Sequence, residues 1–402
     1  MKFLSKFKGI TADLIYSVLG LVVMHGVIQL VLYPTLNRSL GYEKFGTVLT
    51  LISIISIMSA TFGTAANYSR MVSFQRGREV KGDYNVFLLV IILVSIPVSV
   101  AGLVLSGESE PVGYIVYIAL MAATILRYYA DVEFRLNINY KRFFVYYLLI
   151  SLGYLLGIVL FKMTGMWMLA MIIGEVSAVL YVVFIGHIFR KPLFEASDYI
   201  RDNMKTFLVL SGTEIIGTLV LNADRLLLKI FVDSAAVTVF YAATLIGKTI
   251  ALVSMPLNSV IIGHLARFEG KMSRKLFCGF CAGGALLSLP VNLFCTAISY
   301  VFVQIMYPDV FDVAKDYFFI ANLGQILYFI SSTLTVVLLR FSKEKYQLVI
   351  NVIYFIVFLI LAVPMTYVNG VTGMAWAIVS ANLFKILVIM LVGVRVMKGE
   401  ES

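Results

Sequence analysis

The feature that most constrains this chain is a succession of long apolar runs. Twelve of them are long enough to cross a membrane, at residues 10–36, 45–68, 84–106, 112–131, 143–162, 166–186, 205–228, 236–264, 274–303, 316–339, 347–366 and 371–394. A helix needs about 20 apolar residues to cross a hydrocarbon core about 30 Å thick. Only helices and closed barrels satisfy all backbone hydrogen bonds there. We therefore expect an all-α polytopic membrane protein with about twelve transmembrane helices.

The composition supports this class and limits the others. Hydrophobic residues make up 61% of the chain and charged residues 13%, whereas soluble domains have about 45–50% and about 25%. The three cysteines, Cys278, Cys281 and Cys295, lie in or beside one apolar run. No second Cys/His pair lies near them in the sequence, so we expect them to pack as small side chains and predict no metal site.

Basic residues favour alternate loops. Most of the 32 Lys and Arg lie in loops on one side, together with both chain ends, while the opposite loops carry acidic turns near Glu108 and Asp309. The positive-inside rule therefore places both termini in the cytoplasm. The same bias explains the net charge of +10 without a nucleic-acid partner.

The longest polar connection divides the chain almost in half. We expect an N-terminal lobe of six helices at 1–188, a cytoplasmic linker at 189–204 and a C-terminal lobe of six helices at 205–402. The segment NYSRMVSFQRGR at 67–78 matches GHLARFEGKMSR at 263–274 in pattern. Because each half holds an even number of spans, this pattern predicts a parallel repeat about an axis along the membrane normal.

Two glycine pairs have the GxxxG spacing that allows helices to pack closely. They are Gly153 with Gly157, and Gly279 with Gly283. We expect both pairs to serve helix packing, not function.

Four basic residues lie inside apolar runs: Arg127, Arg225, Lys248 and Lys385. A charge at the centre of a membrane helix costs about 2.5–3.5 kcal/mol on insertion scales, so such groups face a bundle interior or a wet cavity. Lys248 and Lys385 would attract an anionic substrate, or would pair with an acid on a neighbouring helix such as Glu214. Arg225 would line the cavity or pair locally with Asp224.

Arg127 has three interpretations. It would line the cavity, pair with Asp131 four residues later on the same helix face, or extend its side chain to the cytoplasmic interface, which we favour slightly.

The remaining polar groups in the runs also have two interpretations each. Glu214 would bind H⁺ or Na⁺, or would be the counter-charge of a lysine. Asp224 would contribute to ion coupling, or form a salt bridge or headgroup contact near the outer end of its run. His25 would titrate near neutral pH or act as a hydrogen-bonding packing residue. Basic groups outnumber acidic ones inside the runs, which favours an anionic substrate.

Several motifs are absent from the sequence. It has no G-x-x-x-x-G-K-[ST] loop for nucleotide hydrolysis and no Ser/His/Asp set or metal-ligand cluster. We therefore expect a protein that is not an enzyme and needs no cofactor beyond a coupling ion.

Two segments carry a resemblance to a known family. LNRSLGYEKFG begins at Leu36, and NADRLLLKIFVDSAAVTVFYAATLIGKTIALVSMPLNSVIIGHLAR begins at Asn222. Together with the twelve predicted spans, they resemble the Wzx-type polysaccharide (O-antigen) flippases of the multidrug/oligosaccharidyl-lipid/polysaccharide (MOP) exporter superfamily. The sequence departs from that family in the run at 45–68, which holds no basic residue in its interior, although relatives often carry one.

The resemblance implies a V-shaped pair of lobes around a central cavity in a bacterial inner membrane protein. Such proteins translocate undecaprenyl-pyrophosphate-linked oligosaccharide for O-antigen, lipopolysaccharide or capsule synthesis, beside polysaccharide polymerase and chain-length machinery. The cavity would hold the basic groups Lys248, Lys385, Arg127 and Arg225. Sugar contacts would come from Tyr241, Thr244, Asn258 and His25, and ion coupling from Glu214 and Asp224.

Two other functions compete with this one. A cation-coupled multidrug exporter of the same superfamily would need acids, more than lysines, facing its cavity. A membrane O-antigen polymerase or ligase usually carries a large external loop with catalytic Arg or His, whereas the predicted outer loops are short.

Overall fold

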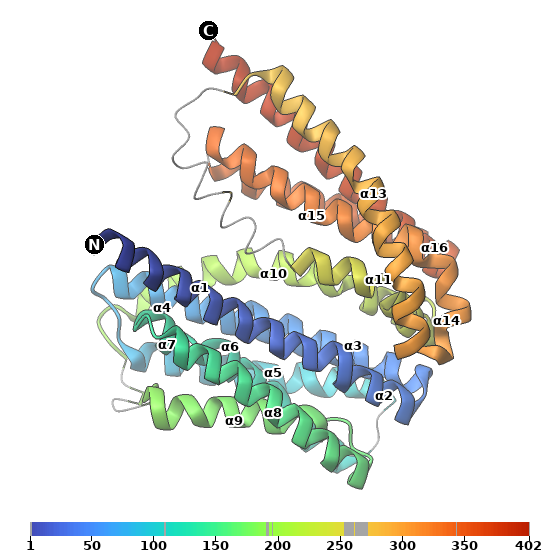
Figure 1. Cartoon of the computed structure of the whole chain (residues 1–402). Coiled ribbons are helices and arrows are strands. Elements are labelled where there is room, and N and C mark those ends of the chain that lie inside the picture. The colour runs from blue at the N-terminus through green and yellow to red at the C-terminus, as the bar shows by residue number, and fades with distance from the viewer. Residues whose placement is uncertain are drawn as a thin grey trace. The chain divides into compact units, whose positions relative to one another are not determined.

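The computed structural model describes residues 2–107, 110–189, 193–194, 196–252, 261, 272–342 and 344–401. Every regular element in these ranges is a helix (Figure 1), as the apolar runs predict. The α-helices are α1 (Lys2–Val27), α2 (Tyr33–Leu40), α3 (Tyr42–Met58), α4 (Thr64–Gln75), α5 (Lys81–Leu105), α6 (Pro111–Ala130), α7 (Val132–Leu136), α8 (Tyr140–Thr164), α9 (Leu169–Tyr181), α10 (Ile200–Phe231), α11 (Ser234–Leu252), α13 (Arg274–Met306), α14 (Pro308–Ala314), α15 (Phe318–Phe341) and α16 (Glu344–Glu401). Short π-helical segments at Ile28–Leu32, Ser59–Gly63 and Val182–Gly186 continue α1, α3 and α9.

Eleven stretches of the described chain are long and apolar enough to cross a membrane, and the last spans Tyr346–Met397. This last stretch holds two crossings. Its 52 residues would extend about 78 Å as one straight helix, more than twice the hydrocarbon thickness. Gly370 breaks the helical backbone with φ 56° and ψ −131°. A Cβ on Gly373 would lie 1.8 Å from the carbonyl oxygen of Met365, although a straight helix would separate these residues by about 12 Å. The chain therefore turns back at Gly370, and the predicted twelve crossings are recovered.

Contacts divide the chain into two compact units. Unit 1 comprises Met1–Ser39 and Thr50–Asn222, and unit 2 comprises Leu40–Leu49 and Ala223–Ser402. The boundary between Asn222 and Ala223 lies inside α10, whereas the sequence predicts lobes separated by the linker at 189–204. The predicted division into two lobes of six helices stays a prediction. The second copy of the proposed repeat, at 263–274, lies mostly outside the described residues.

Close helix packing in unit 1 depends on glycine. A Cβ on Gly153 would lie 2.4 Å from the Cα of Gly174, and one on Gly157 would lie 2.5 Å from the carbonyl oxygen of Ala170. Helices α8 and α9 therefore touch backbone to backbone, and the expectation for this glycine pair is confirmed. For Gly279 and Gly283 the expectation stays a prediction, because a Cβ at either would meet no atom of the described residues within 4 Å.

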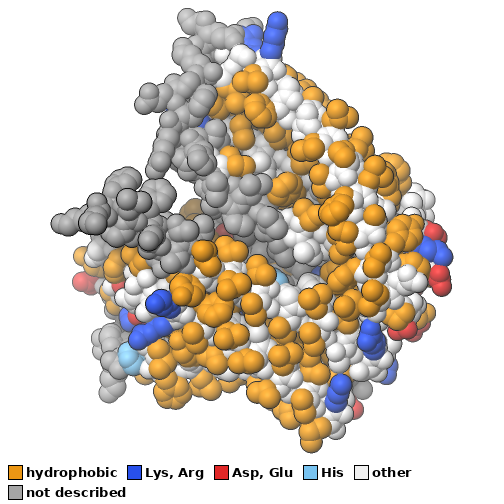
Figure 2. Space-filling model, in the orientation of Figure 1, with side chains coloured by type: hydrophobic (Ala, Val, Ile, Leu, Met, Phe, Trp, Pro, Cys, Tyr) orange, Lys and Arg blue, Asp and Glu red, His pale blue; other side chains and the backbone are white. Residues whose placement is uncertain are grey.

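Unit 2 has its own apolar core, which gathers side chains from α13, α15 and α16, including Phe277, Leu327 and Ile389. A polar contact fixes α11 against α15, where the backbone N–H of Gly247 donates to Oδ1 of Asn322 at 2.8 Å. The outer surface is also apolar. On the described part of the face drawn in Figure 2, hydrophobic side chains are widespread and charged side chains are few, as expected of helices that face lipid.

The two glycine pairs allow a matched test of packing. We expect Gly157→Ala to lower the free energy of unfolding of the purified protein by about 1–3 kcal/mol, because the added methyl group meets rigid backbone. Gly283→Ala is the control, and it should leave stability unchanged or raise it, since alanine favours a helix and the space is open. Thermal unfolding in one detergent measures both variants. Equal destabilisation by the two would contradict the described α8–α9 contact.

Candidate functional site

Arg127 forms a buried ion pair in the middle of unit 1. Its Nε donates to Oε2 of Glu175 on α9 at 2.7 Å, and the hydroxyl of Tyr154 on α8 donates to Oε1 of the same carboxylate at 2.5 Å. The guanidinium also stacks 4.1 Å from the ring centroid of Tyr128. Arg127 is only 7% exposed, so it does not extend to an interface. Its formal charge is balanced by Glu175.

The predicted pairing of Arg127 with Asp131 is wrong as well, because other donors occupy that carboxylate. Arg135 binds Asp131 through Nε and Nη2, each at 3.0 Å. Asn67 donates to it at 2.5 Å and the hydroxyl of Tyr147 at 3.0 Å. Arg135 has the i,i+4 spacing that the sequence could have indicated, whereas Asn67 on α4 and Tyr147 on α8 come from other helices and could not be found from spacing along one helix.

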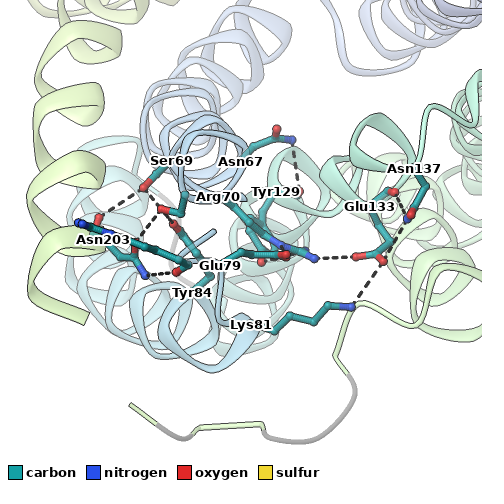
Figure 3. A network of polar contacts seen from close by, with 12 residues as sticks. Asn67, Ser69, Arg70, Glu79, Lys81, Tyr84, Tyr129, Glu133, Asn137 and Asn203 are labelled. Carbon is teal, nitrogen blue, oxygen red and sulfur yellow. Dashed lines mark hydrogen bonds and ion pairs between the residues drawn. The ribbon is translucent and has the colours of Figure 1, made fainter. Parts of the chain in front are cut away.

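A second polar network closes one end of unit 1 (Figure 3). Arg70 on α4 is 1% exposed and lies between two acids, with Nε 2.6 Å from Glu79 and Nη2 2.9 Å from Glu133. Lys81 reaches Glu133 at 3.5 Å. From its loop position, the sequence predicted only a cytoplasmic surface charge at Arg70. The signal for burial was weak, since it required pairing Arg70 with acids in two other segments.

The same end of unit 1 holds the start of α10. The side chain of Asn203 accepts from Ser73 at 2.6 Å and donates to Asp83 at 2.8 Å. Asp83 also accepts from the backbone and hydroxyl of Ser197, at 2.8 and 2.7 Å. The start of α10 and the segment before it are therefore fixed to α4 and α5.

Two predicted site residues of unit 1 make no hydrogen bond or ion pair with any residue in the described ranges. His25 is half-buried on α1, within electrostatic range of Arg127. Glu214 is half-buried on α10, and its charge acts on Tyr68. Within the described residues, both side chains therefore have hydrogen-bonding capacity left for a ligand, proton or ion.

In unit 2, Lys248 on α11 forms a salt bridge to Oδ2 of Asp224 on α10. The acid is nearly enclosed, with 4% of its side chain exposed, whereas the lysine side chain is 23% exposed. The partner suggested from the sequence, Glu214, is therefore incorrect. Arg225 stacks 5.4 Å from the ring centroid of Tyr241.

The predicted sugar contacts on α11 lie inside the packed core of unit 2. Tyr241 is buried and packs edge-on against Phe45 and Tyr307, with ring centroids 6.0 and 5.9 Å away. Thr244 is fully buried, and its hydroxyl donates to the backbone of Phe240 at 2.9 Å. Neither side chain faces a cavity here. Asn258 lies outside the described residues.

Lys385 on α16 is the other cation of unit 2 and has no acidic partner among the described residues. It is 5% exposed. Its Nζ lies 4.7 Å from the ring centroid of Tyr354 and 5.5 Å from that of Tyr328. The described residues inside the apolar runs of unit 2 include the cations Arg225, Lys248 and Lys385 and the acid Asp224, which pairs with Lys248. No group of three or more His, Cys, Asp or Glu in the searched ranges is placed to hold a metal ion.

Comparisons with known proteins identify the fold. No protein-family model matches the sequence, and no curated protein matches it. Among solved structures, the lipid II flippase MurJ in an inward closed conformation is similar at a TM-score of 0.71 and 14% identity, over 94% of this chain and 87% of that one. An inward-facing multidrug resistance MATE family transporter of the MOP superfamily gives a TM-score of 0.66 at 14% identity, over 95% and 99%. A MOP superfamily transporter from Pyrococcus furiosus gives 0.63 at 13% identity, over 97% and 96%.

At these identities the likeness concerns the fold alone. The chain is an all-α, multi-pass membrane protein with the fold of MOP superfamily transporters. The expected fold class is confirmed, whereas the resemblance to the Wzx-type branch and the choice of substrate stay predictions.

The pair between Arg127 and Glu175 gives a prediction about stability. Glu175→Gln leaves the buried guanidinium without a counter-charge, so we expect a loss of about 3–5 kcal/mol, or failure to accumulate in the membrane. Asp312→Asn, which breaks the exposed pair with Lys315, is the control and should change stability little. Thermal unfolding together with membrane abundance measures both, and a Glu175→Gln protein as stable as the control would contradict a buried pair.

Proposed function

We propose that this chain is a flippase that moves an anionic, undecaprenyl-pyrophosphate-linked oligosaccharide across the bacterial inner membrane by alternating access. The observation that carries the proposal is Lys385, a buried ammonium group without an acidic partner in the described chain. An ammonium at the centre of a membrane helix costs about 2.5–3.5 kcal/mol. The cation–π contacts with the two tyrosine rings offset about 0.5–2 kcal/mol each. An anionic ligand near Lys385 would offset the remaining cost.

Charge in unit 2 supports the same substrate class. Asp224 pairs with Lys248, whereas Lys385 has no acidic partner in the described chain, and this buried positive charge favours phosphate or acidic sugar over a cationic drug. For the Pyrococcus furiosus transporter, reversed polarity of the binding pocket suggests a different function. MurJ is a flippase of a lipid-linked molecule, lipid II. Both comparisons fit a basic site for a lipid-linked anion on this fold.

One observation favours the second candidate, a cation-coupled multidrug exporter. Glu214 is a half-buried acid without a partner in the described chain, and an acid of this kind suits a cation. In the proposed flippase, Glu214 would bind the coupling H⁺ or Na⁺ instead. The solved structures reported above are all transporters or flippases, which favours transport over a polymerase or ligase reaction.

Complementation tests the proposal and its key residue. The chain should restore surface polysaccharide to a strain that lacks its own O-antigen or capsule flippase. We expect Lys385→Ala to reduce that restoration about tenfold or more, as loss of about 1.4 kcal/mol of anion binding would. Lys385→Arg keeps the charge and should retain part of the activity. Lys162→Ala, an exposed lysine in the last turn of α8, is the control.

Two results would overturn the proposal. If Lys385→Ala restored surface polysaccharide fully at equal membrane abundance, Lys385 would not be the anion site. Failure to rescue any such strain, together with increased efflux of a cationic dye, would identify the multidrug exporter.

The pair between Lys248 and Asp224 needs a separate test, because a lysine of this kind serves either structure or substrate. We expect Lys248→Met to lower the thermal midpoint, since it leaves Asp224 buried without a counter-charge. Adding Asp224→Asn should recover the midpoint. If the double variant recovers the midpoint but still lacks flippase activity, the pair serves transport through Lys248 or Asp224, and if activity returns, the pair is structural.

A further inference from the structure

A polar cavity of about 350 Å³ lies in unit 2, where the first turn of α3 meets the start of α11. It is lined by Glu43, Lys44, Thr47, Asp233, Ser234 and Ala235. Its volume falls at the lower end of the usual range for small-molecule sites, about 300–1,000 Å³. We call it the α3–α11 pocket.

Close backbone contact builds the floor of this pocket. A Cβ on Gly46 would lie 1.7 Å from the carbonyl oxygen of Ser234, so only glycine lets α3 approach so closely. The hydroxyls of Thr47 and Ser234 lie 2.9 Å apart, and the hydroxyl of Thr238 donates to the carbonyl of Tyr42 at 2.6 Å. The two helix starts are therefore fixed in position.

The charged groups on the walls of the pocket have spare hydrogen-bonding capacity. Glu43 and Lys44 form no hydrogen bond or ion pair with other residues of the described chain, although they have opposite charges and line one cavity. Asp233 uses Oδ1 to cap α11 at the backbone N–H of Ala236, 2.7 Å away. Lys229 donates to the hydroxyl of Ser234 at the floor.

The balance of charge selects the kind of ligand. An anion in this pocket would meet the carboxylates of Glu43 and Asp233, and a metal cation would meet the ammonium group of Lys44. A neutral, polyhydroxylated ligand avoids both penalties, because its hydroxyls donate to the carboxylates and accept from Lys44.

We propose that the α3–α11 pocket binds neutral saccharide. The basic residues predict that this end of unit 2 faces the outside, so the pocket would receive the oligosaccharide after translocation. The identity of the ligand as the sugar part of a translocated molecule rests on the proposed function, whereas saccharide binding itself does not.

Saturation-transfer NMR of the full-length protein in lipid nanodiscs tests this site, with maltotriose and chitotriose as neutral probes and inorganic pyrophosphate as the anionic probe. We expect saturation transfer to at least one saccharide. The signal should fall at least tenfold in Glu43→Gln/Lys44→Met, which changes two exposed side chains. It should persist in Asp309→Asn, which changes an exposed acid in the first turn of α14, and pyrophosphate should not compete with it.

The outcomes separate this proposal from the flippase itself. No saccharide signal from the unmodified protein, a signal that survives the double variant, or displacement by pyrophosphate would overturn the pocket. Lys385→Ala should keep the saccharide signal while losing complementation. A strain rescued by a protein without saccharide binding would therefore refute the pocket alone, and binding without rescue would refute the flippase alone.

Discussion

The structure depends first on the cost of an unpaired polar group in hydrocarbon. Backbone N–H and C=O groups there must bond within their own segment, which is why the regular elements of the described chain are helices. Buried side-chain charges obey the same constraint. Arg127 is matched by Glu175, and Arg70 by Glu79 and Glu133, so unit 1 neutralises these buried cations with acids from other segments of the chain.

The buried charges of unit 2 are arranged differently, and the proposed flippase function rests on this difference. In the salt bridge between Lys248 and Asp224, the side chain of the acid is buried and the side chain of the lysine is partly exposed. Lys385 rests on two tyrosine rings in place of a carboxylate. A fold shared by flippases and multidrug transporters does not identify a substrate. In the proposed function, the arrangement of charge within that fold favours an anionic lipid-linked substrate over a cationic drug.

Close backbone packing at glycine is the second feature that recurs in the described chain. Gly157 lets α8 touch α9, Gly46 lets α3 touch the start of α11, and Gly373 lets the two halves of α16 meet after the break at Gly370. Each replaces a side chain by direct backbone contact. These contacts need no hydrophobic driving force, which is weak between helices already surrounded by apolar lipid chains.

The sequence by itself determined the class of protein, the helical fold and the approximate bounds of the crossings, because length and apolarity act locally along the chain. It also predicted which charges lie within the apolar runs. Only the tertiary structure decided their partners. Arg127 pairs with Glu175 and not Asp131, and Lys248 with Asp224 and not Glu214, since each partner lies on another helix whose position the sequence does not give. Likewise, the two GxxxG pairs are alike in sequence, yet within the described residues Gly153 and Gly157 meet a neighbouring helix and Gly279 and Gly283 do not. Spacing fixes the face of a helix, whereas packing fixes what lies opposite that face.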